Sequence, residues 1–367
     1  MRYRWIDDIS DFGDISGQWD DALVKSGSEN PFLLSDFIIT WWKCCHRGRK
    51  LRIFVIYDND TIVGGLPLYL KRGGLRDGFA RILTYIGDSA ANYTEPLIVS
   101  GDVRFLPIFM DAVSDLRECD AVYLNDVRAD GIFLLSEYGD LGKEKGFFMF
   151  FLQDHMNYAI DLSAGKDEYM KSISRKLRKD LRSKRKHAIN NYGPMRLKKI
   201  NGREEIEKYF ELYLKFSGQA FVSRNKTSIF SDGEIATFFR EFLVSMDRKD
   251  RLTAHVFFGG DTVMAISFAY RFGRGFKWIL TGFNYDCKDV RPGYLFIEEL
   301  ISEMCNMGET HCNCYGHATF YKKQWCNRQE PLYRVFLVKK TARGMVYRNL
   351  KYAASALKSK EILVKVK

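Results

Sequence analysis

Residues 252–325 constrain the fold of this chain more than any other segment, because strand periodicity is followed there directly by helix periodicity. Three runs rich in β-branched and aromatic residues, separated by glycine-containing turns, lie at 252–258, 262–272 and 276–283. Such runs predict three adjacent antiparallel strands. From Tyr294 onward the apolar residues recur at helical spacing, and residues 311–315 then read as another strand. We therefore expect an α/β (α+β) fold.

The start of the predicted helix has the chemistry of an anion-binding site. Pro292 and Gly293 lie at this start. A helix N-terminus offers unpaired backbone N–H groups and a partial positive charge. A glycine there lets an anion approach the backbone without meeting a Cβ atom. The sequence therefore predicts a position that could hold a pyrophosphate.

The N-terminal half repeats this order of elements. Its predicted strands lie at 51–57, 61–70, 81–86 and 121–125, with a helix at 105–116. Residues 147–161 read as the strand that crosses between the halves. With 367 residues, of which 46% are hydrophobic, the chain can bury two ordinary cores. We expect similar units at 1–160 and 161–341, followed by a basic helical tail at 342–367 that docks at the periphery.

Positive charge is concentrated in one segment of a chain whose net charge is +11. Residues 171–186 contain nine Lys or Arg and one acid. On a helical projection, one stripe separate from the apolar face holds Arg175, Arg178, Arg182 and Arg185. Guanidinium groups bind phosphate or carboxylate with two parallel hydrogen bonds, so this stripe suits a nucleotide, a lipid phosphate or RNA. The alternative is a solvated basic face that only aids solubility.

Several segments resemble the acyl-CoA N-acyltransferases of the GNAT superfamily, and specifically the CelD/BcsL-like branch that is related to the FemAB aminoacyltransferases. The resemblance is carried by Arg291-Pro292-Gly293-Tyr294-Leu295, by Gly316, and by Tyr321-Lys322 with Trp325. The basic segment at 174–182 and Asn30-Pro31-Phe32-Leu33 with Trp41 fit the same branch. Together these segments cover about residues 30–340.

The resemblance implies tandem GNAT-like domains, each with a mixed, mostly antiparallel sheet flanked by helices. It implies acetyl-CoA or another acyl-CoA as the cofactor, held by Leu280, Gly282, Arg291, Gly293 and Tyr294. The implied acceptor is a small molecule or glycan precursor, with or without phosphate, that carries an amino group, such as a sugar or a cell-envelope polysaccharide precursor. Residues assigned to it are Asn92, Tyr93, Arg178, Arg182 and Lys322.

The catalytic residues implied by the resemblance are Tyr321, His317 and Asn313. Tyr321 would act as the general acid or bind the substrate, and its alternative role is packing against Trp325. His317 would be the base because histidine titrates near neutral pH, although a lone loop histidine is more often structural.

The family pattern differs from this chain at two positions. Where the family pattern has an acid, this chain has Asn313, and where the pattern has an Asp-Tyr pair, this chain has Asn92-Tyr93. Asparagine forms hydrogen bonds but cannot act as a general base. An inactive binding module with the same fold is therefore one alternative. A second is an aminoacyl-tRNA-dependent transferase, which would use the arginine stripe for RNA; otherwise we expect no stable nucleic-acid partner.

A zinc site is the remaining alternative for residues 311–326, where His311, Cys312, Cys314, His317 and Cys326 cluster. The Cys-x-Cys spacing is not the usual zinc spacing, so we expect no metal. Eight cysteines without a Cys-x-x-Cys pair favour free thiols. The longest uncharged apolar runs are too short to span a bilayer, and no signal-peptide pattern is seen at the start, so we expect a cytoplasmic protein.

Overall fold

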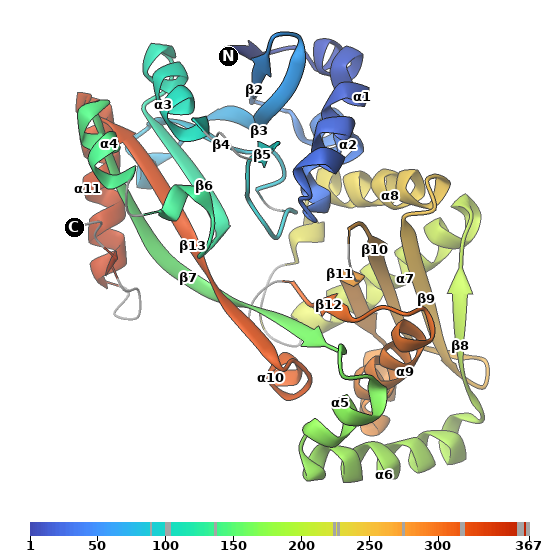
Figure 1. Cartoon of the computed structure of the whole chain (residues 1–367). Coiled ribbons are helices and arrows are strands. Elements are labelled where there is room, and N and C mark those ends of the chain that lie inside the picture. The colour runs from blue at the N-terminus through green and yellow to red at the C-terminus, as the bar shows by residue number, and fades with distance from the viewer. Residues whose placement is uncertain are drawn as a thin grey trace. The chain divides into compact units, whose positions relative to one another are not determined.

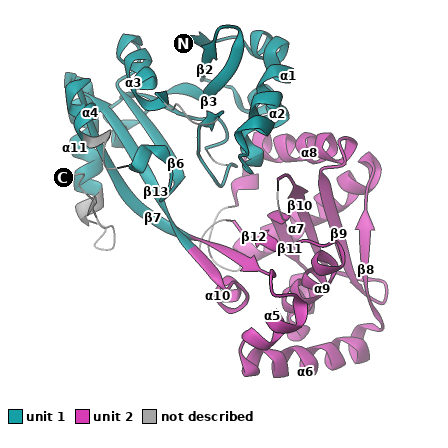
Figure 2. Ribbon diagram, viewed as in Figure 1, with its two compact units in different colours: residues 1–156, 330–367 teal, residues 157–329 magenta. Residues whose placement is uncertain are grey.

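The computed structural model describes all residues except 89, 100–103, 136–137, 223–224, 226–227, 274–275, 316–319, 358–362 and 365–367. The chain divides into two compact units (Figure 2). Unit 1 contains residues 1–156 and 330–367, and unit 2 contains residues 157–329. Each unit has a mixed sheet with flanking helices, which confirms the predicted α/β class (Figure 1).

The strand order in unit 1 is β1-β2-β3-β4-β6-β13-β7, and β4 and β6 are parallel. These strands are β1 (Arg2–Ile6), β2 (Lys50–Asp58), β3 (Thr61–Arg72), β4 (Arg81–Tyr85), β6 (Ala121–Arg128), β13 (Arg328–Lys339) and β7 (Phe147–Asp161). Two short strands, β5 (Leu97–Ile98) and β14 (Leu363–Val364), pair with β3 and β7. Its helices are α1 (Ile9–Ser26), α2 (Ser35–Cys45), α3 (Phe105–Asp115), α4 (Tyr138–Glu144) and α11 (Ala342–Leu357), with 3-10 turns η1 (Pro31–Leu33), η2 (Leu75–Asp77) and η3 (Ile132–Leu134).

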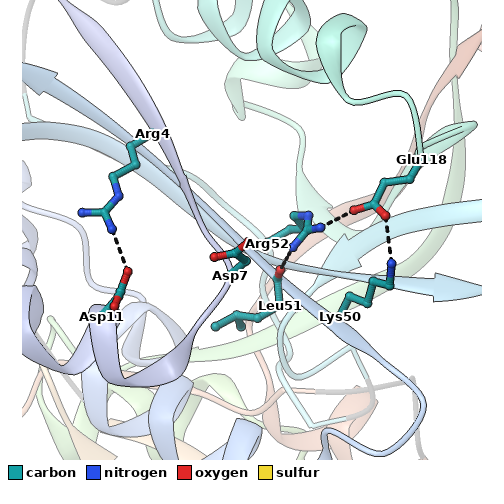
Figure 3. Close-up of polar contacts among 7 residues, drawn as sticks. All are labelled: Arg4, Asp7, Asp11, Lys50, Leu51, Arg52 and Glu118. Carbon is teal, nitrogen blue, oxygen red and sulfur yellow. Dashed lines mark hydrogen bonds and ion pairs between the residues drawn. The ribbon is translucent and has the colours of Figure 1, made fainter.

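Apolar packing, rather than surface charge, holds the first elements of unit 1 together. Asp8 caps α1 by accepting from the Ser10 backbone N–H at 2.8 Å, and the helix buries Trp19 completely. Ion pairs link Arg4 to Asp11 and Glu118 to two cations of β2 (Figure 3). The Arg4 and Asp11 side chains are about half exposed, so such a pair contributes at most about 1 kcal/mol.

The strand order in unit 2 is β7-β12-β11-β10-β9-β8. Its strands are β8 (Met195–Ile200), β9 (Leu252–Gly259), β10 (Thr262–Arg271), β11 (Phe276–Phe283) and β12 (His311–Asn313), with the last residues of β7. The helices are α5 (Lys166–Ser172), α6 (Arg175–Tyr192), α7 (Arg203–Val222), α8 (Gly233–Arg248), α9 (Pro292–Asn306) and α10 (Phe320–Trp325), with 3-10 turns η4 (Ile229–Ser231) and η5 (Tyr285–Val290). The predicted meander and the helix that begins at Pro292 are thus confirmed.

The C-terminal segment from residue 330 belongs to unit 1, whereas we had expected residues up to 341 in the second domain and the rest as a tail. Strand β13 pairs with β6, as in the register Val338↔Ala121. Helix α11 buries Tyr347 in the same cluster as Phe150 and Phe336. Pairing between segments about two hundred residues apart leaves no local signal, which is why the sequence pattern assigned them elsewhere. Within the described residues, no helix is both long and apolar enough to cross a membrane.

Candidate functional site

Strand β11 separates from β12 after a very short ladder. In the described part of the chain, this parallel ladder has two residue pairs, Phe276↔Cys312 and Lys277↔Asn313. On its other edge β11 stays paired with β10 as far as Phe283. The backbone polar groups on the β12 side of residues 278–283 therefore lie outside that ladder, where a ligand can use them.

A β-bulge lies at the point where the two strands separate. Leu280 pairs with Phe268, but the next pair is Trp278 with Ala269, so Ile279 is an extra residue in β11. A bulge bends its strand and redirects backbone groups. The separation of β11 from β12 thus coincides with a local irregularity of β11 itself.

A cavity of about 510 Å³ lies at this edge of β11. Its wall combines the end of β11, one face of α7, η5, the start of α9 and one residue of α10. The lining residues are Tyr213, Phe216, Ser217, Ala220, Phe221, Thr281, Gly282, Phe283, Tyr285, Lys288, Arg291, Pro292, Gly293, Tyr294, Ile297 and Tyr321. The α7 residues are three or four positions apart, as one helix face requires.

The start of α9 gives this cavity a positive end. No side chain caps the helix, and Pro292 occupies its first turn. Arg291 precedes it in the left-handed conformation, with φ 52° and ψ 59°. Its guanidinium pairs with Asp180 and lies 5.7 Å from the Tyr294 ring centroid. The helix dipole, Arg291 and Lys288 together fit an anionic ligand such as a phosphate.

Two glycines in the wall are in close contact with aromatic rings. A Cβ atom at Gly293 would lie 3.0 Å from Cδ1 of Phe283, and one at Gly282 would lie 2.9 Å from Cδ2 of Tyr213. Both distances are too short for ordinary packing. The packing of the protein itself therefore requires small residues here, in addition to any ligand.

Two tyrosines line the cavity near the α9 start. The Tyr294 hydroxyl donates a hydrogen bond to Oε1 of Gln324 at 2.6 Å, and burial raises the pKa of Tyr294. Tyr321 reaches the same cavity from α10. Among the described lining residues there are phenols, hydroxyls and two cations, but no carboxylate and no imidazole. The wall can therefore donate protons more readily than it can accept them.

Five of the predicted residues meet in this cavity, namely Gly282, Arg291, Gly293, Tyr294 and Tyr321. Leu280 is 5% exposed and packs beside it in β11. Asn313 lies in β12, where it pairs with Lys277 of β11 on one side and with Ala159 of β7 on the other. His317 lies outside the described residues.

Lys322 has a different environment from the one predicted. We had expected it to contact a phosphate or carboxylate of the substrate, but its side chain is 4% exposed and its Nζ donates to the Tyr315 carbonyl oxygen. Burial lowers its pKa. Since Lys322 immediately follows Tyr321 on a helix, the two side chains point in different directions and only Tyr321 lines the cavity.

The predicted arginine stripe of α6 divides into two pairs with different surroundings. The Arg178 guanidinium donates to the carbonyl oxygens of Met170, Lys171 and Ile173 at the end of α5. Arg185 contacts Glu298 and Glu299 of α9, both at 2.7 Å. Arg175 and Arg182, in contrast, are exposed.

Asn92 and Tyr93, predicted to bind substrate, belong to unit 1. The Tyr93 hydroxyl donates to Oε1 of Glu330 at 2.6 Å. The Arg128 guanidinium lies 5.8 Å from the Tyr93 ring centroid. The tyrosine is 6% exposed, so these contacts fix it within its own unit.

One group in the described part of the chain has the geometry of a metal site. Asp126, Asp154 and His155 of unit 1 place their ligand atoms within 4.8 Å of one another. Arg334 contacts Asp154 at 3.4 Å, so a cation already neutralises part of the negative charge. Burial raises the pKa of Asp126 to about 6. We regard the group as an ion-pair cluster.

Sequence reasoning missed the α7 face, Lys288 and Gln324. The α7 residues show helical apolar spacing, so their helix could have been predicted from that signal. Its contact with β11 had no sequence signal. Gln324 is recognisable only through its hydrogen bond with Tyr294. His255 of β9 is 2% exposed, and burial lowers its pKa to about 4.

Comparison with known proteins identifies the class of domain that carries this cavity. Residues 175–323, all within unit 2, match the family model of the acetyltransferase (GNAT) domain. Unit 2 therefore resembles a GNAT-type acetyltransferase domain over most of its length. No curated protein sequence matches the chain.

Solved structures extend the likeness in fold to both units. FemX matches with a TM-score of 0.58 and 11% identity, over 91% of this chain and 97% of that one. A conserved protein of unknown function from Bacteroides thetaiotaomicron matches with a TM-score of 0.58 and 12% identity, over 92% and 100%. The C-terminal domain of a putative lysylphosphatidylglycerol synthetase from Agrobacterium fabrum matches with a TM-score of 0.52 and 11% identity, over 93% and 96%. At such identities the likeness concerns the fold alone.

Proposed function

We propose that unit 2 is an acyl-CoA-dependent N-acyltransferase that works in the cytoplasm. The acyl donor that we propose is acetyl-CoA, with longer acyl-CoAs as the alternative. The observation that carries this proposal is the cavity that joins the open edge of β11 to the uncapped start of α9. A GNAT-domain match over the same residues supports it. The acceptor that we propose is an amino group of a sugar or a cell-envelope polysaccharide precursor, in keeping with the CelD/BcsL-like resemblance.

A CoA thioester would supply an activated carbonyl group. Amide formation joins the amine nitrogen to that carbon and breaks the C–S bond, while the amine loses a proton and the sulfur gains one. The protein must hold the two reactants together, since positioning accounts for much of the rate of such a step.

The residues around the cavity divide these tasks. Backbone N–H groups at the open edge of β11 would donate to the carbonyl oxygen as it gains negative charge. The N-terminus of α9, with Lys288 and Arg291, would hold the phosphates. Tyr321 or Tyr294 would give a proton to the sulfur, because a phenol that is protonated at neutral pH can donate one.

The acceptor amine would have to be neutral before it attacks. Because the described wall has no carboxylate or imidazole, the base would be water or His317, with Asn313 hydrogen-bonding the acceptor. We therefore expect the rate to rise with pH toward the pKa of the acceptor amine.

Thermal shift and calorimetry with acetyl-CoA, longer acyl-CoAs and free CoA test the donor. We expect stabilisation by the acyl-CoAs, and CoA release when a suitable amine is added. A chain that binds CoA but releases no thiol with any of a panel of amino sugars would be the inactive binding module. A lack of binding to every acyl-CoA would exclude the main proposal.

The second candidate is an aminoacyl-tRNA-dependent aminoacyltransferase. It is favoured by the fold likeness to FemX and by the exposed Arg175 and Arg182 on α6. Binding through several phosphates would make the affinity for tRNA fall steeply with salt. A steep slope together with no response to acyl-CoA would select this candidate.

A further inference from the structure

Unit 1 has an exposed apolar patch that the proposed activity does not use. It consists of Leu75 in η2, Phe79 two residues after η2, and Val346 and Leu350 on α11, with exposures of 78%, 51%, 49% and 37%. The two segments touch, because a Cβ atom at Gly78 would lie 2.7 Å from Cγ1 of Val346 and 3.3 Å from Cδ1 of Leu350. We call these four residues the η2–α11 patch.

The patch is separate from the core face of α11. The core face contributes Tyr347, which is 1% exposed, and Tyr352, whose ring stacks on Phe150 with 4.6 Å between centroids. Val346 and Leu350 are four residues apart and therefore project together from another face of the helix. Contact with the segment around Gly78 covers part of Val346 and Leu350, but 49% and 37% of their surfaces stay exposed, so the fold of unit 1 accounts for only part of their apolar character.

Basic side chains lie on both segments that form the patch. Helix α11 contains no acid and carries Arg343 three residues before Val346 and Lys351 next to Leu350, while its Arg348 lies over the Phe148 ring. The η2 turn adds Arg76, and its acid, Asp77, already accepts from Lys351 at 2.6 Å. The border of the patch therefore has net positive charge.

We propose that unit 1 docks on the surface of an anionic lipid bilayer through the η2–α11 patch. Apolar side chains with basic neighbours suit the boundary between lipid headgroups and acyl chains. There the apolar side chains enter the lipid, and the basic side chains contact anionic headgroups. A second copy of this chain is a poorer occupant. A two-fold contact through the same patch would bring the arginines of both copies together.

Vesicle co-sedimentation of the full chain tests the proposal. We expect binding to vesicles of equal parts phosphatidylcholine and phosphatidylglycerol, and much weaker binding to phosphatidylcholine alone. The variant L75S/F79S should bind the anionic vesicles at least tenfold more weakly. The variant R76Q/R343Q should lose affinity by about fivefold per cation at low salt, since one basic residue near such a surface contributes about that factor.

Matched controls use exposed residues of the same kinds elsewhere in unit 1. Val24 is 70% exposed and Lys25 is exposed, both on α1, so V24S and K25Q should bind vesicles like the wild type. All six positions are at the surface, and unchanged thermal unfolding would show that the variants fold.

Three results would overturn the proposal. One is the absence of co-sedimentation with anionic vesicles. Another is equal binding by L75S/F79S and V24S. The third is a dimer in solution that L75S/F79S dissociates, which would assign the patch to self-association.

Discussion

Gly293 illustrates how one residue can serve both packing and ligand binding. Its missing Cβ leaves room for the Phe283 ring, and it also lies in the cavity wall at the start of α9. A simple loss of affinity in a Gly293 variant would therefore be ambiguous. Separating the two roles requires substitutions that differ in charge.

We predict that Gly293→Asp weakens acyl-CoA binding at least tenfold more than Gly293→Ala does. Both variants introduce the Cβ contact with Phe283, but only aspartate places a negative charge where the phosphates are proposed to lie. Calorimetric titration with acetyl-CoA gives the affinities. Thermal unfolding gives the loss of stability that both variants share because of the contact with Phe283. Equal affinities of the two variants would move the phosphate site away from α9.

Asp126 is a residue whose burial opposes folding at neutral pH. Burial raises its pKa to about 6, well above the ordinary value of an aspartate, and Asp154 acts in the same direction while His155 and Arg334 lower it. The folded protein thus holds this proton more tightly than the unfolded chain does. Its contribution to the free energy of unfolding is fully present below about pH 4 and is lost as the pH rises through about 6.

We predict that Asp126→Asn raises the free energy of unfolding by about 1–2 kcal/mol at pH 7 and leaves it nearly unchanged at pH 4. Asparagine tolerates the left-handed backbone at this position, where φ is 54°. Urea unfolding at both pH values measures the difference, with Asp60→Asn, which replaces an exposed carboxylate of the same unit, as the control. An equal gain at both pH values would show that ionisation is not the cause.

At the scale of elements, α6 joins its neighbours through only part of its basic side chains. Arg178 connects it to the end of α5 and Arg185 to α9, whereas Arg175 and Arg182 face solvent. Two of the four arginines that look equivalent in the sequence therefore connect helices, and the other two are exposed to solvent.

We predict that only one of the two pairs of α6 arginines affects stability. R178Q and R185Q should each lower the free energy of unfolding by about 1–2 kcal/mol, because charged hydrogen bonds and partly buried pairs are lost. The variant R175Q/R182Q should stay within about 0.5 kcal/mol of the wild type. If the chain is a tRNA-dependent transferase, only R175Q/R182Q should also reduce the slope of log affinity for tRNA against log salt concentration, by about two. Urea unfolding and salt-dependent binding measure these effects, and the reverse order would refute the division.

Elements were predicted well wherever their signal was local. The strand at residues 147–161 has the predicted limits, and α9 begins at the predicted Pro292. The contact of α7 with Gly282 could not be predicted, because an apolar helix face does not specify which strand it covers. The burial of Lys322 was missed for a similar reason, since lysine is normally exposed.

At the scale of the whole molecule, unit 1 is completed by residues from both ends of the chain. Strand β13 enters its sheet beside β6, and α11 covers Phe150 and Phe336. The stability of unit 1 must therefore depend on the last part of the sequence, while unit 2 contains none of it.

We predict that truncation after residue 341 destabilises unit 1 by about 3–5 kcal/mol, because the aromatic contacts of Tyr347 and Tyr352 are lost. Hydrogen exchange should speed up in β6 and β13 and stay nearly unchanged in β9 and β10. Truncation after residue 357, which keeps α11, is the control and should cost much less. Unchanged exchange in β6 after the longer truncation would contradict this role of α11.

Local sequence patterns were enough to predict the α/β class, most strands and helices, and the glycine-containing helix start, because periods of 2 and 3.6 residues follow directly from backbone geometry. Packing in three dimensions sets which distant segments share a unit, and which polar residues are buried or line the cavity. Arg178 and Lys322 donate hydrogen bonds to backbone carbonyl oxygens, and the Tyr321 side chain lines the cavity. Such outcomes depend on neighbours that are remote in the chain, so no local pattern contains them.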